Sequence, residues 1–367
     1  MGDSFEVRAP MKALVIQVRA QAGQQVAKGE TLVILEAMKM EHIVAAEQSG
    51  VVTRVHVDPD SMVDEAQPLV SLRAAEVESA KVADAAASID EARADLAEVI
   101  ARHAFGLDEN RPEAVAKRRK TGQRTARENV QDLVDEGSWV EYGALVIAAQ
   151  RQRRPKDDLI ARTPADGMLA GIGRINAQLF GEENTRAVVT SYDYTVLAGT
   201  QGTMNHLKKD RMFEVAAEQH LPVVLFSEGG GGRPGDTDYA VVAGLDCRAF
   251  QYFAELSGKV PLVGINSGRC FAGNAALLGC CDVVIATKAS NFGMGGPAMI
   301  EGGGLGVYSP DQIGPSATQY RNGVFDVLVQ DDEEAVAVSK KYLVYFQGEL
   351  REWDHADHRE LRAAIPE

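Results

Sequence analysis

An internal repeat constrains residues 1–73 more than any other feature of the chain. Apolar positions between residues 11 and 72 recur at an offset of 37 residues. Each copy holds short runs of alternating apolar and polar residues separated by turn residues, which is typical of half-buried antiparallel strands. We expect the two copies to close into an all-β sandwich with an approximate two-fold axis. The matching pairs are Leu14 with Val51, Val15 with Val52, Val18 with Val55, Val26 with Val63, Leu32 with Leu69, Val33 with Val70 and Leu35 with Leu72.

The segment Glu36 to Glu41, Glu-Ala-Met-Lys-Met-Glu, joins the two copies of the repeat. Shifting Lys39 by the repeat length in either direction reaches the ends of the domain, so the two-fold places this segment opposite the termini. We therefore expect Lys39, flanked by Met38 and Met40, on a tight hairpin that a modifying enzyme or a distant active site can reach. A plain hairpin with an exposed lysine is the simpler alternative.

Composition limits the classes of function. The formal charge of −15 at pH 7 argues against a nucleic-acid-binding surface. The chain has no apolar run of about 18 residues and no basic, apolar leader, so we expect neither a membrane span nor secretion. The four cysteines form no Cys-x-x-Cys pair, which fits a reducing compartment, and we expect a cytoplasmic protein.

The stretch from Arg73 to Phe105 contains neither Gly nor Pro. Apolar residues recur in it at helical spacing, at 82, 89, 96 and 99. About 30 helical residues would span roughly 45 Å, which suits an arm between a mobile domain and a distant site. A helix packed against the next domain is an equal alternative.

Residues 111–128 form a basic segment. A solvated basic helix face is the ordinary interpretation, and contact with an anionic ligand such as the phosphates of coenzyme A is the second. Its cations are Arg111, Lys117, Arg118, Arg119, Lys120, Arg124 and Arg127.

Beyond residue 160, apolar runs alternate with helix-like segments. This alternation predicts parallel βαβ units with right-handed crossovers. We expect strands at 187–191, 221–226, 261–265 and 282–286, and helices at 203–219, 237–257 and 271–280.

Two of the predicted strand-to-helix turns are rich in glycine, at 227–236 and 267–274. Glycine lets a ligand approach the backbone closely, and free N–H groups at a helix start attract a negative oxygen. Three interpretations remain open at this point. Residues 230–235 match the dinucleotide pattern G-x-G-x-x-G, although they follow an internal strand. The turn could instead form an oxyanion hole, or serve packing alone.

The sequence Glu-Ala-Met-Lys-Met, with Ala9-Pro10-Met11 before it and Gly50 after it, closely resembles the biotin carboxyl carrier domain. The resemblance implies a biotinyl/lipoyl-type sandwich with biotin attached covalently to Lys39. Lipoyl carriers share this fold, but the flanking Met38 and Met40 favour biotin. Lys12 departs from many carriers, which have Gly after the Pro-Met pair.

The segments 121–128 and 133–138 resemble the N-terminal signature of a carboxyltransferase, and residues 165–348 resemble its N-terminal half. The resemblance implies an α/β crotonase-like domain, a ClpP-type spiral. The family's Ser-Gly-Gly-Ala-Arg turn aligns with residues 229–233, which places the oxyanion amides at Gly230 and Gly231. Its second glycine turn implies a biotin and coenzyme A pocket at Gly268, Phe271, Ala272 and Gly273.

Together the resemblances imply an acyl-CoA carboxylase component that moves CO2 from carboxybiotin on Lys39 to the α carbon of an acyl-CoA. The implied division is a carrier domain at 1–73, a helical linker with the basic segment at 74–135, and the N-terminal half of a carboxyltransferase at 136–367. The implied partners are a biotin carboxylase, a biotin protein ligase and a carboxyltransferase C-terminal half that completes the site, in a homo-oligomer without nucleic acid or membrane.

The alternatives are a biotin-dependent decarboxylase and a non-catalytic carrier or assembly subunit. The sequence offers no metal motif, and neither Ser227 nor Ser267 has a spaced His–Asp pattern. We expect His206 and His220 to be surface or satisfied core residues. Cys270 lies among apolar residues, so we do not expect a nucleophile there.

Overall fold

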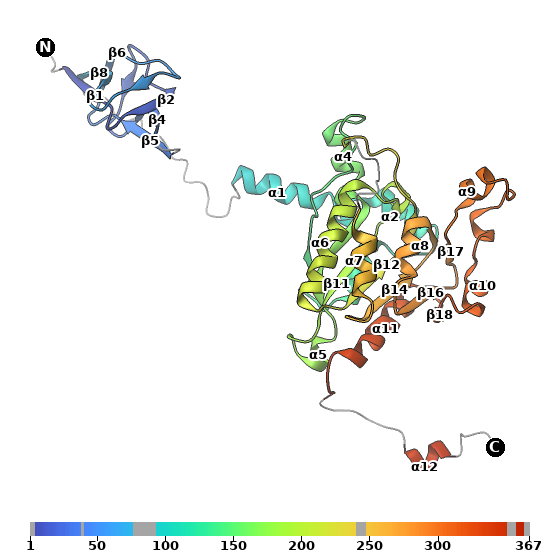
Figure 1. Ribbon diagram of the computed structural model, residues 1–367. Coiled ribbons are helices and arrows are strands. Elements are labelled where there is room, and N and C mark those ends of the chain that lie inside the picture. The colour runs from blue at the N-terminus through green and yellow to red at the C-terminus, as the bar shows by residue number, and fades with distance from the viewer. Residues whose placement is uncertain (1–3, 38–39, 76–92, 240–246, 351–356, 363–367) are drawn as a thin grey trace. The chain divides into compact units, whose positions relative to one another are not determined.

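The computed structural model describes residues 4–37, 40–75, 93–239, 247–350 and 357–362 (Figure 1). The chain divides into two compact units, Met1–Ala94 and Asp95–Glu367. Among the described helices, none is both long and apolar enough to cross a membrane.

The smaller unit consists of two four-stranded sheets, ordered β1-β8-β6-β3 and β5-β4-β2-β7. Adding 37 to the bounds of β2, β3 and β4 gives the bounds of β6, β7 and β8. The same operation relates the two sheet orders, with β5 as the counterpart of β1, so the predicted two-fold sandwich is confirmed. The strands are β1 Ser4–Arg8, β2 Ala13–Val18, β3 Gln25–Val26, β4 Thr31–Ala37, β5 Met40–Ala45, β6 Gly50–Val55, β7 Met62–Val63 and β8 Pro68–Ala74.

The core of the smaller unit contains only Val, Leu and Ala. Five of the seven predicted repeat pairs are fully within it, because alternate residues of each strand face the opposite sheet. Leu14 and Val51 are half-buried instead, and Val18 and Val55 pack against the rim of the core. Burial of each Val or Leu side chain contributes about 1.5–3 kcal/mol, so this apolar pattern is the main source of the unit's stability.

The larger unit is built on a seven-stranded sheet with the order β18-β16-β14-β12-β11-β10-β9. The strands from β11 to β18 are parallel and β10 and β9 are antiparallel to their neighbours. The four predicted strands are confirmed as β11, β12, β14 and β16. The bounds are β9 Val140–Glu141, β10 Met168–Arg174, β11 Arg186–Tyr192, β12 Val223–Phe226, β14 Leu262–Asn266, β16 Val283–Thr287 and β18 Val327–Val329.

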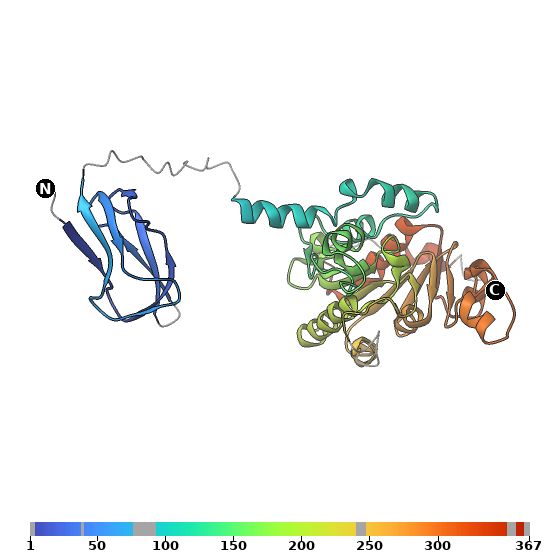
Figure 2. The same ribbon diagram turned by 90° about the horizontal axis from the view of Figure 1, so that it is seen from above.

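Helices cover both faces of this sheet (Figure 2). Helices α6 (Thr203–Gln219) and α7 (Ala249–Leu256) pack on one face, against side chains such as Val223 and Leu262. Helices α3 (Ala126–Leu133) and α11 (Asp332–Leu343) pack on the other, against Val224 and Val263. Neighbouring strand residues therefore face opposite layers, as expected for a sheet buried on both sides.

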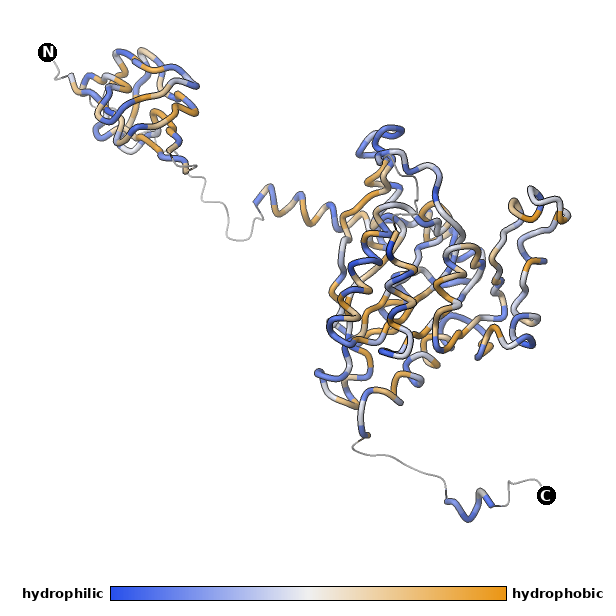
Figure 3. Tube along the Cα trace, viewed as in Figure 1, coloured by the Kyte–Doolittle hydropathy of each residue, from blue (hydrophilic) through white to orange (hydrophobic). Residues whose placement is uncertain are grey.

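One helix prediction needs correction, and another falls partly outside the described residues. The expected helix at 237–257 is helical only as α7, and residues 240–246 lie outside the described part. The N–H groups of Thr237 and Asp238 both donate to the carbonyl of Ala149, so the backbone here is held by another segment. In the expected helix after residue 73, α1 covers Ala94–Ala104, and residues 76–92 lie outside the description. Figure 3 shows α1 with alternating hydrophobic and hydrophilic residues.

A separate three-stranded parallel sheet follows the carboxyl ends of the central strands. Its strands are β13 Gly229–Gly230, β15 Arg269–Phe271 and β17 Asn291–Gly293, and α8 (Ala272–Leu278) begins directly after β15. Further helices and turns complete the unit. They are α2 Pro112–Arg119, α4 Lys156–Arg162, α5 Ala177–Phe180, α9 Pro297–Gly302, α10 Ser316–Arg321 and α12 His358–Leu361, with 3-10 turns at Asp108–Asn110, Pro164–Gly167, Leu197–Gly199, Pro310–Gln312 and Val344–Phe346.

Candidate functional site

The two predicted glycine turns lie side by side in the small parallel sheet. Gly230 of β13 pairs with Phe271 of β15, and a Cβ on Gly230 would lie 3.3 Å from the Cβ of Phe271. A Cβ on Gly231 would lie 3.6 Å from the Cβ of Ala272. The structure therefore brings together residues that the sequence separates by about forty positions. Both glycines are partly exposed, so their backbone is accessible to a ligand.

Gly229 is the position in the first turn that most requires glycine. Its φ of +91° is unfavourable for side chains, and a Cβ would lie 2.5 Å from the carbonyl oxygen of Gly199. Gly231 also has a positive φ of +67°, but a Cβ there meets only the ordinary contact with Ala272. The backbone of the turn is thus fixed at Gly229 by close packing and is open at Gly231.

The other predicted pocket residues lie at the two ends of β15 and differ in their exposure to solvent. Phe271, Ala272 and Gly273 follow one another from the end of β15 into the first turn of α8. Gly268 lies at the other end of β15, is buried, and leaves no room for a side chain beside the Glu228 carboxylate. Gly268 therefore contacts the support of the first turn, whereas Ala272 and Gly273 are partly exposed.

A buried ion pair lies directly before the first glycine turn. Arg118 donates to both carboxylate oxygens of Glu228, at 2.8 and 2.6 Å, and both side chains are almost fully buried. Gln123 donates to the carbonyl of Ser267 at 2.8 Å, which ties the same region to the second turn. Burial raises the pKa of Glu228 to about 7, against the lowering effect of the Arg118 charge. Bidentate Arg–carboxylate pairs of this kind fix the orientation of the two side chains as well as pairing their charges.

Most cations of the basic segment have partners within this chain, as Arg118 does. Five of its seven cations form ion pairs with carboxylates of the same chain, and three of these arginines, Arg111, Arg118 and Arg127, are largely buried. The pairs are Arg111 with Asp193, Arg118 with Glu228, Arg119 with Glu128, Arg124 with Asp132 and Glu333, and Arg127 with Glu141.

Side-chain amides hold the carbonyl groups behind the first turn. Asn274 donates to the carbonyl of Glu228 at 2.7 Å and to that of Gly199 at 3.0 Å. Gln201 donates to the side-chain oxygen of Asn274 at 2.9 Å, and its backbone N–H donates to the carbonyl of Gly231 at 2.9 Å. Within one trans peptide group, the N–H of a residue points opposite to the C=O of the residue before it. The held carbonyls of Glu228 and Gly231 therefore orient the N–H groups of Gly229 and Gly232, the residues on either side of Gly230 and Gly231.

Arg233 anchors the downstream end of the turn. Its buried guanidinium pairs with Asp166 and donates to the carbonyl of Thr200 at 2.9 Å. The other carboxylate oxygen of Asp166 accepts the N–H of Asn205 at 2.9 Å. Burial raises the pKa of Asp166, and the Arg233 charge opposes that rise. The turn is thus held at both ends by buried charge pairs.

Sequence reasoning missed Arg118, Gln201, Asn274 and Arg233 as supporting residues. The partners are far apart in the chain, 110 positions for Arg118 and Glu228 and 73 for Gln201 and Asn274. The one available signal was that Arg233 and Asn274 directly follow the two glycine runs.

The disfavoured nucleophiles are unreactive in the structure. Burial raises the pKa of Cys270 to about 12, and its thiol contacts the Ser227 hydroxyl at 3.3 Å. Ser227 donates to the carbonyl of Asn274 at 2.9 Å.

His206 is a buried core residue beside the Cys247 thiol, at 2.9 Å, and burial lowers its pKa to about 2. His220 is exposed at the end of α6. Within the described residues, no cluster of His, Cys, Asp or Glu could hold a metal ion.

In the smaller unit, Met38 and Lys39 lie outside the described residues, between Ala37 and Met40. These two neighbours pair at the end of β4 and β5, and Met40 is 64% exposed. The site of the predicted attachment is therefore a connection at one end of the sandwich, flanked by an exposed methionine. This arrangement fits a covalently attached group that must leave the surface of its own domain.

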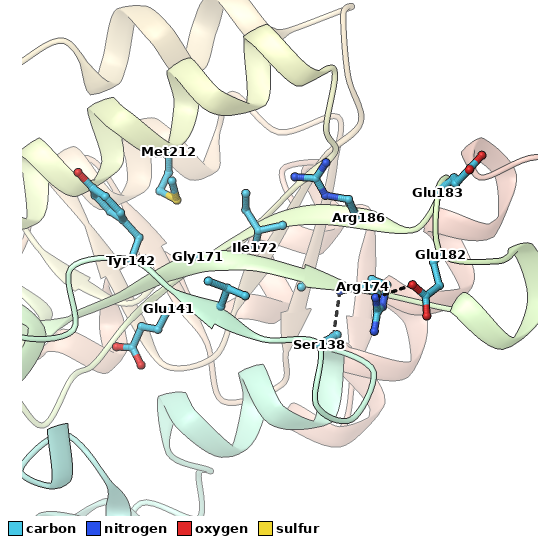
Figure 4. Close-up of a pocket in the computed structure, with 12 residues that line it drawn as sticks. Ser138, Glu141, Tyr142, Gly171, Ile172, Arg174, Glu182, Glu183, Arg186 and Met212 are labelled. Carbon is cyan, nitrogen blue, oxygen red and sulfur yellow. Dashed lines mark hydrogen bonds and ion pairs between the residues drawn. The ribbon is translucent and has the colours of Figure 1, made fainter. Parts of the chain in front are cut away.

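A further cavity lies elsewhere, at the β9–β10 edge of the main sheet. Its volume is about 740 Å³, and Figure 4 shows Tyr142, Ile172 and Met212 among the side chains that line it. Arg174, Glu182, Glu183 and Arg186 line its outer part. No residue of either glycine turn lines this cavity, so it is separate from the candidate site.

Comparisons with known proteins agree with this division of the chain. Residues 5–72 match the family model described as biotin-requiring enzyme. Residues 117–366 match the family model described as carboxyl transferase domain.

Several curated proteins are similar to the larger unit. The β4 subunit of a biotin-dependent long-chain acyl-coenzyme A carboxylase from Mycobacterium tuberculosis is 31% identical over 253 residues, covering 68% of this chain and 45% of that protein. The propionyl-CoA carboxylase β chain of Saccharopolyspora erythraea is 28% identical over 253 residues, covering 68% and 44%. This chain thus spans less than half the length of these relatives.

One solved structure matches both units. It is described as a single-chain, multi-domain long-chain acyl-CoA carboxylase and is 54% identical, with a TM-score of 0.71. The match covers 99% of this chain and 34% of that protein. A transcarboxylase 12S structure is 26% identical, with a TM-score of 0.57, and covers 69% of this chain and 48% of that protein.

Proposed function

The chain belongs to the carboxyl transferase family and carries a biotin-requiring domain ahead of its transferase domain, and from this premise we propose that it is the carrier and transferase part of an acyl-CoA carboxylase. The observation that carries the proposal is the pair of glycine turns, set side by side above buried Arg118, Gln201, Asn274 and Arg233. Such rigid support is what a site needs to stabilise a transient negative charge.

We propose Lys39 as the attachment site of biotin, with Met38 and Met40 as its recognition flanks. Bound biotin would supply a carboxyl group that travels between two active sites. The residues of this chain would place it against the substrate, with Gly268, Phe271, Ala272 and Gly273 forming the pocket beside the turn. The position of Met40 at the exposed end of β5 supports this assignment.

The amides of Gly230 and Gly231 are the proposed donors to the thioester oxygen of an acyl-CoA. Removal of the α-proton moves negative charge onto that oxygen, and donors fixed in advance stabilise it without reorganisation. The loss of one such donor typically costs about 3 kcal/mol in the transition state. The carbonyl of Gly231 is already held by Gln201, so a shift of one residue would recruit the N–H of Gly232 instead.

The finer features of the scheme are also proposals. The larger unit is a crotonase-like spiral, with the carrier at 1–73, the linker and basic segment at 74–135 and the transferase half at 136–367. A biotin carboxylase, a biotin protein ligase and a carboxyltransferase C-terminal half are the expected partners, within a cytoplasmic homo-oligomer. The similarity to relatives named as propionyl-CoA and long-chain acyl-CoA carboxylases supports an acyl-CoA substrate.

A chimera gives the most specific test. The 54%-identical single-chain carboxylase supplies every other domain, so its matching segment is replaced by this whole chain. With ATP and bicarbonate, we expect carboxylation of acetyl-, propionyl- or long-chain acyl-CoA, and none by the Lys39→Ala chimera. The control is Lys28→Ala, an exposed lysine of the same unit, which should keep full activity. An expressed, biotinylated chimera without acyl-CoA carboxylation would contradict the proposed function.

A further inference from the structure

A lysine without a counter-ion is buried behind the glycine turn. Lys209 of α6 is 0% exposed, and its ammonium donates to the Tyr192 hydroxyl at 2.8 Å and to the side-chain oxygen of Gln201 at 3.2 Å. The ammonium also lies 5.1 Å from the centre of the Tyr192 ring. Within the described residues, no carboxylate lies within ion-pair distance of it. Burying a charge without a counter-ion destabilises the folded protein. A functional role for the ammonium would explain why the fold contains it.

A chain of hydrogen bonds connects this ammonium to the turn. Gln201 accepts from Lys209 and donates to Asn274, which in turn donates to the carbonyls of Glu228 and Gly199. The backbone N–H of Gln201 also donates to the carbonyl of Gly231. The side chain and the backbone of Gln201 therefore connect Lys209 to both ends of the glycine pair.

The surroundings of Lys209 bring the pKa of its amine close to neutral pH. Burial lowers the pKa of its amine to about 7. Asp210 on the same helix, Asp166 before β10 and the Cys247 thiol before α7 favour the charged form, whereas Arg233 beyond β13 opposes it. His206, one turn earlier on α6, is neutral because burial lowers its pKa to about 2. The Tyr192 hydroxyl stays protonated, since burial raises its pKa.

We propose that Lys209 is a positioning residue for carboxyl transfer: its ammonium holds Gln201 and Asn274 behind the glycine turn and favours the negative charge that develops on the oxygen bound in front of it. A cation in a low-dielectric interior acts over several ångströms without being screened by water. The inference rests on the proposed function. It adds that the protonation state of Lys209 affects the same site.

The neighbouring Lys208 is a matched control. It lies on the same helix and is almost fully buried, but its ammonium donates to the carbonyls of Ala165 and Met168. It makes no hydrogen bond to Gln201 or Asn274 among the described residues. Lys208→Met and Lys209→Met therefore remove the same buried group from adjacent positions, and only Lys209 hydrogen-bonds to Gln201.

The experiment compares these variants in the chimera described above, with the rate of acyl-CoA carboxylation followed from pH 6 to pH 9. Lys209→Met should lower kcat roughly tenfold at pH 6 with little change in the KM for acyl-CoA, because the contact matters in the transition state. The ratio of wild-type to variant kcat should fall toward one as pH rises through about 7, since Lys209 then loses its proton. The ratio cancels ionisations that both proteins share, and for Lys208→Met it should not vary with pH.

A second variant covers the case in which Lys209→Met does not fold. Tyr192→Phe keeps the volume of the side chain but removes one acceptor of the ammonium, so the kcat of this variant should fall with rising pH at a lower pH than that of the wild type. A kcat ratio for Lys209→Met that does not depend on pH, or the same pattern in Lys208→Met, would overturn the inference. An unchanged pH profile in Tyr192→Phe would do so as well. An inactive wild-type chimera would instead overturn the proposed function.

Discussion

The two units of this chain bury different kinds of side chain. The core of the smaller unit is Val, Leu and Ala, and among residues 4–37 and 40–75 no polar side chain is buried. The larger unit buries Arg118, Asp166, Lys209, Glu228 and Arg233, all close to one pair of turns. An apolar core is enough for a carrier, because its proposed chemistry takes place on an attached group. The proposed site would stabilise charge with its own backbone, and such a site needs buried polar groups to orient that backbone.

The largest expected effect compares one glycine in each unit. Gly229→Ala adds a Cβ that would lie 2.5 Å from the carbonyl oxygen of Gly199, so the turn must move. We expect the acyl-CoA carboxylation rate of the chimera to fall roughly 100-fold or more, as when an oxyanion donor is lost. Gly23→Ala has a similar φ of +87° but meets nothing within 4 Å. It should cost about 1–2 kcal/mol of stability and leave the rate per bound biotin unchanged. Equal losses of carboxylation rate in Gly229→Ala and Gly23→Ala would contradict the expected difference between the two units.

A second comparison lies within one helix, α2. Arg118→Met leaves the Glu228 carboxylate buried without its partner, and we expect the larger unit to lose about 3–5 kcal/mol of stability. Arg119→Met removes an exposed pair with Glu128 and should cost less than about 1 kcal/mol. Both tryptophans of the chain, Trp139 and Trp353, follow residue 94, so urea unfolding followed by tryptophan fluorescence reports the larger unit alone. Similar midpoints for the two variants would show that the buried pair has no special weight.

The third and smallest effect is the pH dependence of stability. Burial lowers the pKa of Lys209 to about 7 and that of Lys208 to about 8, so the unfolded chain binds more protons than the folded one above pH 7. The two lysines should therefore raise the stability of the larger unit between pH 7 and 8, by at most about 1.4 kcal/mol per pH unit for each lysine. Burial raises the pKa of cysteines such as Cys270, so they oppose this rise at higher pH, where the unfolded chain loses their protons first. The smaller unit buries no ionisable group among its described residues and should stay constant in calorimetry. If the stability of the larger unit did not change with pH, the lowered pKa values of the two buried lysines would be contradicted.

The same contrast explains what the sequence could predict. The repeat offset locates β2 through β8, because a core of apolar residues leaves a local, periodic pattern. The central strands and both glycine turns of the larger unit were also visible as apolar runs and glycine clusters. The support of the turns was not, because Arg118 and Lys209 look like ordinary surface residues until their partners are known. Their partners lie on other elements, so no periodicity marks them.

The central claim is that a carboxyl group carried on Lys39 is handed to an acyl-CoA at the glycine turn. The most direct measurement is a single-turnover transfer, in which the chimera is loaded with labelled bicarbonate and ATP and then mixed with acyl-CoA. The label should leave the wild-type protein and appear on the acyl-CoA, never load onto Lys39→Ala, and load onto Gly231→Pro but remain there. Label on acyl-CoA in the Lys39→Ala reaction, or unimpaired transfer by Gly231→Pro, would contradict the account.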